Sequence, residues 1–305
     1  MKQFHKYILF WLSQSISQLG SAMTGFALIL WTYEQTHSAM AVSLMSFCSY
    51  VPMILVSLAA GSLIDRHSKK AVMLLSDSMA AACSFAVFVL SSGGSLEVWH
   101  IYAVNLIIGA MNAFQQPASA AAVGRLVPQE KISAVSGMNS FSGSLTNILS
   151  PVLSAFFFSL GGLPLILALD LASFLAAFII LAGVISIPEE AGTMRKQTIF
   201  AGTKEGFRFL KKEKGIFYLM LTMALINFFS RLTYENILSP MILARSSGSH
   251  EVLGIVNAVM GAGGIAGGVI VSFRKASKNH VRMIYVSAAL SFLLGDLLMA
   301  AGRNA

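Results

Sequence analysis

The sequence predicts an all-α membrane protein with a six-span bundle followed by an incomplete bundle of three spans. Hydrophobic residues make up 56% of the 305 residues, and charged residues make up only 11%. A soluble domain carries about a quarter charged residues, so most of this chain is expected to face lipid. The apolar residues form runs that can cross about 30 Å of hydrocarbon as helices of roughly 20 residues. Helices are expected because they satisfy their own backbone groups in lipid, and the alternation of barrel strands is absent from these runs.

Nine such runs follow one another, separated by short polar segments. They cover Tyr7–Tyr33, Ala39–Ile64, Ala71–Ser91, Val98–Gly124, Ala134–Leu160, Leu163–Ile187, Ile216–Ala244, Val252–Phe273 and Val281–Ala301. The first run is longer than the ~7–15 apolar residues of a secretory signal, so we interpret it as an uncleaved span. Residues 1–187 are therefore predicted to form the six-span bundle, 188–215 a cytoplasmic connector, and 216–305 a partial second bundle.

The connector is the longest polar stretch, with seven lysines and arginines against four glutamates. Within it, Thr203–Lys214 places Phe207 and Leu210 at helical spacing, which is typical of a helix on a membrane surface. A solvated connector is the equal alternative. If the second half mirrored the first, three more spans would follow. Because the chain stops four residues after its last run, we expect a fragment or a truncated gene product.

Lysines and arginines are concentrated in alternate loops. If the N-terminus is cytoplasmic, the cytoplasmic segments hold Lys2, Lys6, Arg66, Lys69, Lys70, Arg125, Lys131, the seven bases of the connector, Arg274, Lys275, Lys278 and Arg282. The opposite side holds only Arg245 and Arg303. This asymmetry predicts a multi-pass protein with its N-terminus inside. The net charge of +8 belongs to these loops, so the sequence argues against a nucleic-acid partner.

No pattern in the sequence indicates an enzyme, a metal site or a cofactor. Cys48 and Cys83 both lie inside apolar runs, without metal-ligand spacing or a disulfide framework. A phosphate-binding loop and a nucleophile elbow are also absent from the sequence. Glycines in the eighth run match a dinucleotide-binding pattern only formally, since no strand precedes them. Gly264 and Gly268 instead form G-x-x-x-G, which predicts close approach of two helices.

Polar side chains recur at steps of three and four residues in the first, fourth and seventh runs, which places each set on one helix face. The bulky members are Gln14, Gln18, Asn105, Asn112, Gln116, Asn227 and Arg231. Polar groups facing lipid are costly, so we expect these residues to line a water-filled cavity. Hydrogen bonding between helices is the alternative, and it fits the fifth run best because its polar residues are small.

Charged residues inside spans are a sharper signal, since each costs about 2.5–3.5 kcal/mol on insertion scales. They are Asp77, Asp170, Arg231, Glu235 and Asp296. Arg231 and Glu235 lie four residues apart, which suits either a salt bridge near the outer surface or a pair coupled to transport. Asp170 lies in mid-span and is a candidate for binding a proton. Asp77 is two turns from Lys69 and Lys70, which favours a structural ion pair.

A short charged segment, Gly61-Ser62-Leu63-Ile64-Asp65-Arg66-His67-Ser68-Lys69-Lys70, joins the second and third runs. We expect the second span to end at Gly61–Ile64 and the third to begin after Lys70. The pattern G-x-L-x-D-R-x-x-K-K resembles the signature loop of the major facilitator superfamily, with Ser68 where a glycine is usual. The resemblance implies that Gly61, Asp65, Arg66, Lys69 and Lys70 form a gating loop that stabilises one end state.

Two further matches narrow the resemblance. Gly137 and the pair Ser150-Pro151 resemble the antiporter motif of the fifth span, although small residues replace its other glycines. This motif favours export over uptake. The segment Gly109–Ala118, followed by Leu126–Glu130, is similar to the fourth span and next loop of bacterial macrolide-efflux and enterobactin-exporter relatives.

The resemblance implies a transporter of the bacterial inner membrane that exports amphiphilic small molecules, macrolide-like drugs above all, in exchange for protons. In that fold the first, fourth and seventh spans line the cavity, in agreement with the polar faces found above. Asp170 and Glu235 are then the candidates for proton coupling. The alternatives are a siderophore or metabolite exporter of the same fold and a non-transporting membrane remnant. The sequence makes no prediction of the oligomeric state.

Overall fold

The structure is a computed structural model that describes residues 2–187, 206, 208–230, 241, 242, 245, 250–273, 283, 285–287, 289–291 and 293. Every regular element in these residues is a helix, which confirms the predicted all-α fold. The chain divides into two compact units. The first comprises Met1–Ile132 and Leu145–Lys204, and the second comprises Ser133–Ser144 and Glu205–Ala305.

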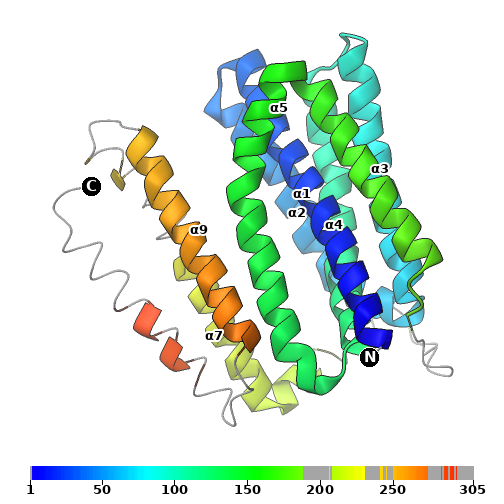
Figure 1. Ribbon diagram of the computed structural model, residues 1–305, viewed down its shortest axis with the longest axis vertical. Helices are drawn as coiled ribbons and strands as arrows, with labels where there is room; N and C mark the ends of the chain where they lie inside the picture. The colour runs from blue at the N-terminus through cyan, green and yellow to red at the C-terminus, as the bar shows by residue number, and fades with distance from the viewer. Residues whose placement is uncertain are drawn as a thin grey trace. The chain divides into compact units, whose positions relative to one another are not determined.

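The described helices of the first unit follow the predicted runs closely. They are α1 (Lys2–Thr36), α2 (Ala39–Arg66), α3 (Lys69–Ser92), α4 (Val98–Leu126) and most of α5 (Ile132–Gly183), which the short η1 (Gln129–Lys131) precedes. Figure 1 shows that α5 turns back on itself as two antiparallel arms. Its helical backbone is interrupted at Gly161 and at Gly162, where φ is 64°. Glycine adopts this conformation without a steric penalty, so the two arms correspond to the predicted fifth and sixth spans.

The junction between α2 and α3 is shorter than predicted. α2 continues through Asp65 to Arg66 rather than ending at Gly61–Ile64, and α3 begins at Lys69. Only His67 and Ser68 separate the two helices. The Ser68 hydroxyl accepts a hydrogen bond from the Ala71 amide at 3.3 Å and so caps the N-terminus of α3. The charged segment is therefore mostly helical.

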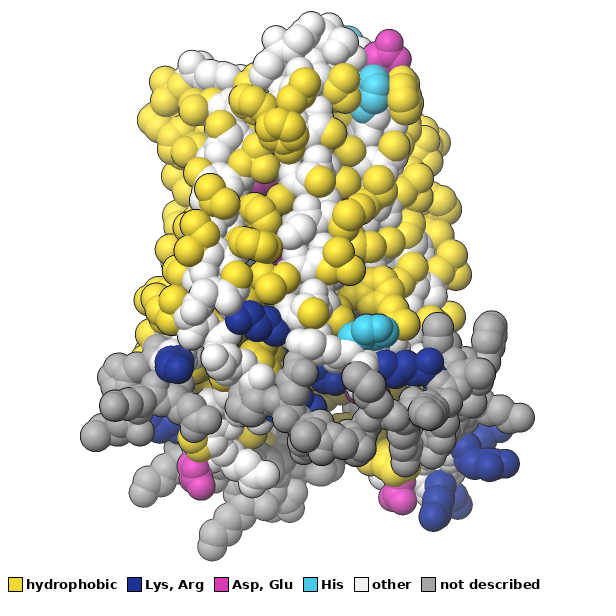
Figure 2. All heavy atoms as spheres, turned by 90° about the vertical axis from the view of Figure 1, so that its right-hand side faces the viewer, with side chains coloured by type: hydrophobic (Ala, Val, Ile, Leu, Met, Phe, Trp, Pro, Cys, Tyr) yellow, Lys and Arg dark blue, Asp and Glu magenta, His cyan; other side chains and the backbone are white. Residues whose placement is uncertain are grey.

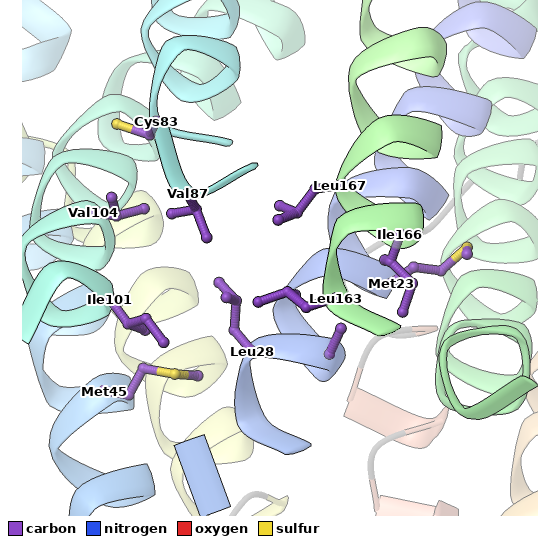
Figure 3. Packing of buried hydrophobic residues seen from close by; sticks show 11 residues of the cluster. Met23, Leu28, Met45, Cys83, Val87, Ile101, Val104, Leu163, Ile166 and Leu167 are labelled. Carbon is purple, nitrogen blue, oxygen red and sulfur yellow. The ribbon is translucent and has the colours of Figure 1, made fainter. Parts of the chain in front are cut away.

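A cluster of buried apolar side chains connects the helices of the first unit. Figure 3 shows Leu28 of α1, Met45 of α2, Val87 of α3, Ile101 of α4 and Leu163 of α5 facing one another, with Met23 of α1 beside Ile166 of α5. Their exposed fractions range from 0% at Ile101 to 5% at Met23 and Met45. Since lipid is as apolar as these side chains, close van der Waals packing stabilises the cluster, rather than removal from water.

Large apolar side chains also cover the surface of the first unit. Leu55 of α2, Leu75 of α3 and Leu160 of α5 are 63%, 65% and 65% exposed. Figure 2 shows such side chains as a broad band, with lysines and arginines gathered at one end. By length and composition, three of the described helical segments could cross a membrane: Met40–Arg66, Lys69–Ser92 and Gln129–Gly183, the last holding two predicted spans. α1 and α4 have 35 and 29 residues, but their polar side chains lower their hydropathy.

α4 packs against α1, α2 and α3, and its Gly109 lies directly against the α2 backbone at Ser49. A Cβ atom at Gly109 would lie 3.1 Å from the Cα atom of Ser49 and closer still to its carbonyl group. Real Cβ atoms do not approach a backbone this closely. The absence of a side chain at Gly109 therefore sets the spacing of α2 and α4.

The second unit contains α7 (Lys214–Ser230) and α9 (His250–Phe273). Gly264 of α9 lies against Ser144, whose hydroxyl oxygen would be 2.5 Å from an added Cβ. This contact matches the close helix approach predicted from the G-x-x-x-G pattern. The Thr222 and Tyr285 hydroxyls are 3.2 Å apart. Most of the connector, residues 231–240 and most of the ninth predicted run lie outside the described residues.

We expect Gly109→Ala to destabilise the protein by about 1–3 kcal/mol, because the added methyl group collides with the Ser49 backbone. Thermal unfolding in detergent, followed by circular dichroism, measures the effect. Gly124→Ala is the matched control on the same helix, because nothing lies within 4 Å of its added Cβ. Alanine favours helix over glycine by up to about 1 kcal/mol, so the control should melt at the same or a higher temperature. Equal melting of Gly109→Ala and the wild type would contradict this account of the α2–α4 contact.

Candidate functional site

Among the described residues of the first unit, the most buried carboxyl group is held by three hydroxyl groups. Asp170, on the second arm of α5, is 4% exposed. Its Oδ1 atom accepts a hydrogen bond from Ser21 Oγ at 3.0 Å. Its Oδ2 atom accepts from Thr24 Oγ1 at 3.0 Å and from Ser84 Oγ at 3.1 Å. The site therefore joins α1, α3 and α5 through one side chain, and we call these four residues the Asp170 cluster.

Local sequence places these groups within reach of one another. Ser21 and Thr24 are three residues apart, so they share one face of α1. Gly20 precedes them, and a Cβ there would lie 3.2 Å from the Asp170 Cα atom and 2.5 Å from Ser173 Oγ. Ser173 Oγ in turn donates to the Asp170 carbonyl at 2.8 Å. The missing side chain at Gly20 thus lets the second arm of α5 lie directly against α1.

The hydrogen bonds described for the Asp170 carboxyl group all come from neutral donors. An ionised carboxylate only accepts hydrogen bonds, whereas a protonated one also donates one. Hydroxyl groups donate and accept, and they rotate to suit their partner. Serine and threonine in a helix can also donate to the carbonyl four residues earlier. The hydroxyl groups of the cluster can therefore serve Asp170 in both protonation states, as donors or as acceptors.

The expected ion pair between Asp77 and Lys69 or Lys70 is not formed. The carboxyl group of Asp77, on α3, is instead hydrogen bonded by the side chain of Gln115 on α4. The two lysines donate to backbone carbonyls. The physical reason is distance, since eight residues of helix separate Asp77 from Lys69 by about 12 Å, while carbonyl groups lie next to each ammonium.

The two lysines of the charged segment bind helix C-termini. Lys69 is 6% exposed, and its Nζ donates to the Ile64 carbonyl at 2.9 Å. Lys70 Nζ donates to the Ala182 carbonyl at 2.7 Å and to the Ile185 carbonyl at 2.8 Å. Carbonyls at a helix end lack partners and carry partial negative charge, so a cation stabilises them. Lys70 thereby fixes the start of α3 to the end of α5.

The other residues of the predicted gating loop are more exposed than Lys69. Gly61 and Asp65 are exposed, and Arg66 is half-buried. Nothing lies within 4 Å of a Cβ added at Gly61. The gating role of Gly61, Asp65 and Arg66 stays a prediction.

The predicted cavity-lining residues do not form one described cluster. Asn105 and Asn227 donate to carbonyls four residues earlier in their own helices, each at 2.9 Å. Gln18 and Gln116 are exposed and Asn112 is half-buried. Gln14 is also half-buried, and its Nε2 atom is buried without a hydrogen-bond partner. Arg231 and Glu235 lie outside the described residues, so the cavity and the outer charge pair stay predictions.

Small polar residues on α5 are buried, as the packing interpretation of the fifth run expects. Ser150 is 8% exposed, Ser154 is fully buried, and Gly137 is buried as well. Ser154 Oγ donates to the Met23 carbonyl of α1 at 2.8 Å. Pro151 lies within the helix between them. This arrangement shows close packing of α5 on α1, and the antiporter role of Gly137, Ser150 and Pro151 stays a prediction.

Two members of the Asp170 cluster, Thr24 and Ser84, were not among the residues selected from the sequence. One signal for Ser84 was available, because it lies seven residues after Asp77 and so falls on the same face of α3. Thr24 lies three residues after Ser21, on the polar side of α1. Neither spacing identifies Asp170 as the partner.

Comparison with known proteins places the chain among membrane transporters. Residues 3–301 match the family described as transmembrane secretion effector, a group within the major facilitator superfamily. Macrolide efflux protein A of Streptococcus pyogenes is 28% identical over 97% of this chain and 73% of its own length. The protein of that name from Enterococcus faecalis is 28% identical over 87% of this chain and 81% of its own length. A staphyloferrin A transporter of Staphylococcus aureus is 23% identical over 97% of this chain and 72% of its own length.

We expect Lys70→Met to destabilise the first unit by about 1 kcal/mol, because it leaves two carbonyls at the end of α5 without their donor. This energy is at the low end for a charged donor, because the Lys70 side chain is partly exposed. Thermal unfolding in detergent measures it. Lys6→Met removes an exposed lysine of α1 and serves as the control. Equal melting temperatures for Lys70→Met and Lys6→Met would show that the cap contributes nothing.

Proposed function

Because the chain belongs to the transmembrane secretion effector family of major facilitator transporters, we propose that it exports macrolide-like amphiphilic molecules in exchange for protons. The substrate class rests on the two macrolide efflux relatives, each 28% identical. The alternating basic loops support insertion into the bacterial inner membrane with the N-terminus inside.

The proposal of proton coupling rests on the Asp170 cluster. When Asp170 is ionised, it accepts the three hydroxyl hydrogen bonds described above. When it takes a proton, one hydroxyl must accept instead of donate and turn its own proton elsewhere. The set of hydrogen bonds between α1, α3 and α5 therefore changes with each proton bound. In the proposed cycle this change alters the packing of α1, which lines the substrate path in transporters of this fold.

The residues selected from the sequence take the following proposed roles. Gln14, Gln18, Asn105, Asn112, Gln116, Asn227 and Arg231 line the path, and Gly61, Asp65, Arg66, Lys69 and Lys70 stabilise one end state. Two helical bundles that rock about a site near the midplane would expose the path to each side in turn. Glu235 is the second candidate for proton coupling.

A siderophore or another metabolite is the second candidate substrate. The relative described as a staphyloferrin A transporter supports it, with 23% identity over 97% of this chain. A competition experiment separates the macrolide from the siderophore. Whichever unlabelled compound the protein binds should, in excess, block export of a labelled macrolide.

Expression of the chain in a drug-sensitive bacterium is expected to lower the accumulation of labelled erythromycin. A protonophore should restore accumulation, because it removes the gradient that drives exchange. Membrane insertion of the chain is verified by fractionation in the same cells. Unchanged accumulation with verified insertion would contradict export of macrolides and favour the non-transporting alternative.

Asp170→Asn is expected to reduce proton-driven export to background while preserving the exchange of labelled for unlabelled substrate. The amide is neutral in every state, so it mimics the protonated acid and cannot release a proton. Export into proteoliposomes with an imposed pH gradient, measured beside exchange without one, separates the two activities. Glu130→Gln removes an exposed carboxyl group of η1 and is the matched control. Wild-type proton-driven export by Asp170→Asn would exclude Asp170 as the coupling residue.

A further inference from the structure

A second carboxyl group, that of half-buried Asp77, lies on the same face of α3 as Ser84. Asp77 is seven residues before Ser84, which places the two about 10 Å apart along the helix and in nearly the same direction. Ser84 belongs to the Asp170 cluster, whereas Asp77 meets α4. There the side chain of Gln115 is its hydrogen-bonding partner. The Asp77 carboxyl group and the Asp170 carboxyl group, which Ser84 contacts from α3, therefore lie at successive levels along α3.

The Gln115 amide is only half satisfied in this contact. Its Oε1 atom is buried and has no hydrogen-bond partner. A buried polar atom without a partner destabilises the fold, so its presence calls for an explanation. An ionised carboxylate cannot supply the missing bond, because it accepts hydrogen bonds and has none to donate.

Protonation of Asp77 would supply the hydrogen bond that Gln115 Oε1 lacks. Its hydroxyl group would donate to Gln115 Oε1 while its other oxygen accepts from the amide nitrogen of Gln115. The acid and the amide then form a planar pair with two parallel hydrogen bonds, and every polar atom of the two groups that faces its partner is satisfied. Rotating the Gln115 amide by half a turn exchanges its oxygen and nitrogen but does not change this result. An ionised Asp77 would still leave the amide oxygen without a donor, whereas a protonated Asp77 would pair with both the oxygen and the nitrogen.

We propose that Asp77 and Gln115 form a second proton-binding site, in which the Asp77 carboxylate takes up a proton and pairs with the Gln115 amide. Proton binding forms one O–H bond and neutralises the negative charge of Asp77, and proton release reverses both changes. The partner is neutral in each state, so the site does not depend on an ion pair. Asp77 thus has a role that the sequence, which suggested pairing with Lys69 or Lys70, did not predict.

Other charged and titratable groups on the elements around α3 do not take the place of Gln115. They include Asp65, Arg66 and Tyr50 on α2, His100, Tyr102 and Arg125 on α4, Lys69, Lys70 and Cys83 on α3, and Asp170 on α5. The two lysines bind backbone carbonyls. Arg125 lies ten residues after Gln115, about 15 Å along α4. Asp170 binds the three hydroxyl groups of its own cluster.

The proposal extends the proton-coupled export proposed above, but its test needs no transported substrate. Infrared difference spectra of the purified full chain, recorded between about pH 4 and pH 9, detect each carboxyl group that gains a proton. We expect a protonated-carboxyl band that Asp77→Asn removes and Asp170→Asn retains. Gln115→Leu should retain the Asp77 band and shift its frequency, because the acid loses its amide partner. Gln129→Leu, on exposed η1, should leave the spectrum unchanged.

A spectrum of Asp77→Asn identical to that of the wild type would overturn the proposal. An unshifted band in Gln115→Leu would overturn the acid–amide pair. Asp77→Glu keeps a carboxyl group and provides a second variant: return of a titrating band supports the site, and its absence in a folded protein counts against it. A titrating Asp77 in a chain that exports nothing would leave this site intact and refute the proposed function. Proton-driven export without an Asp77 band would do the reverse.

Discussion

The structure depends on one constraint, which is that polar groups surrounded by lipid-facing helices must find their partners inside the protein. Asp170 shows the constraint most directly. Its carboxyl group takes hydrogen bonds from α1 and α3, so one side chain holds three helices together. Gly20 allows the close approach that these bonds need, and Ser154 adds a bond to the backbone of α1. Apolar packing fills the space around these contacts, but the polar groups determine which faces meet.

The sequence predicted the helices of the first unit well, because hydrophobicity and length are local properties. The start of α2 at Ala39 and of α4 at Val98 match the predicted runs. The junction after α2 was predicted less well, since hydrophobicity ends before the helix does. Asp65 and Arg66 still continue α2, and the signal for the boundary is the serine cap at Ser68 rather than the charges.

The site was predicted only in part, because its contacts join residues far apart in sequence. Asp170 stood out as a charge in mid-span, yet its partners Ser21 and Ser84 are 149 and 86 residues away. Hydroxyl residues are common in membrane helices, so spacing alone could not identify these two as partners of Asp170. The predicted partner of Asp77 was wrong because it was chosen by closeness in sequence. Sequence proximity suggested a lysine partner, whereas the fold supplies Gln115 from the neighbouring helix.

The neutral character of the partners bears on the proposed cycle. A buried carboxylate paired with a cation is held in one state, because breaking such a pair leaves an uncompensated charge at a cost of about 3–5 kcal/mol. Asp170 is bound by hydroxyl groups and Asp77 by an amide, and both kinds of partner can serve an ionised or a protonated acid. The lysines that could have neutralised Asp77 are instead used at helix ends. The first unit therefore keeps its fixed charges at its helix ends and places groups that can change protonation state between its helices. In the proposed proton-driven cycle, the charges at the helix ends would stay fixed while the groups between the helices change protonation state.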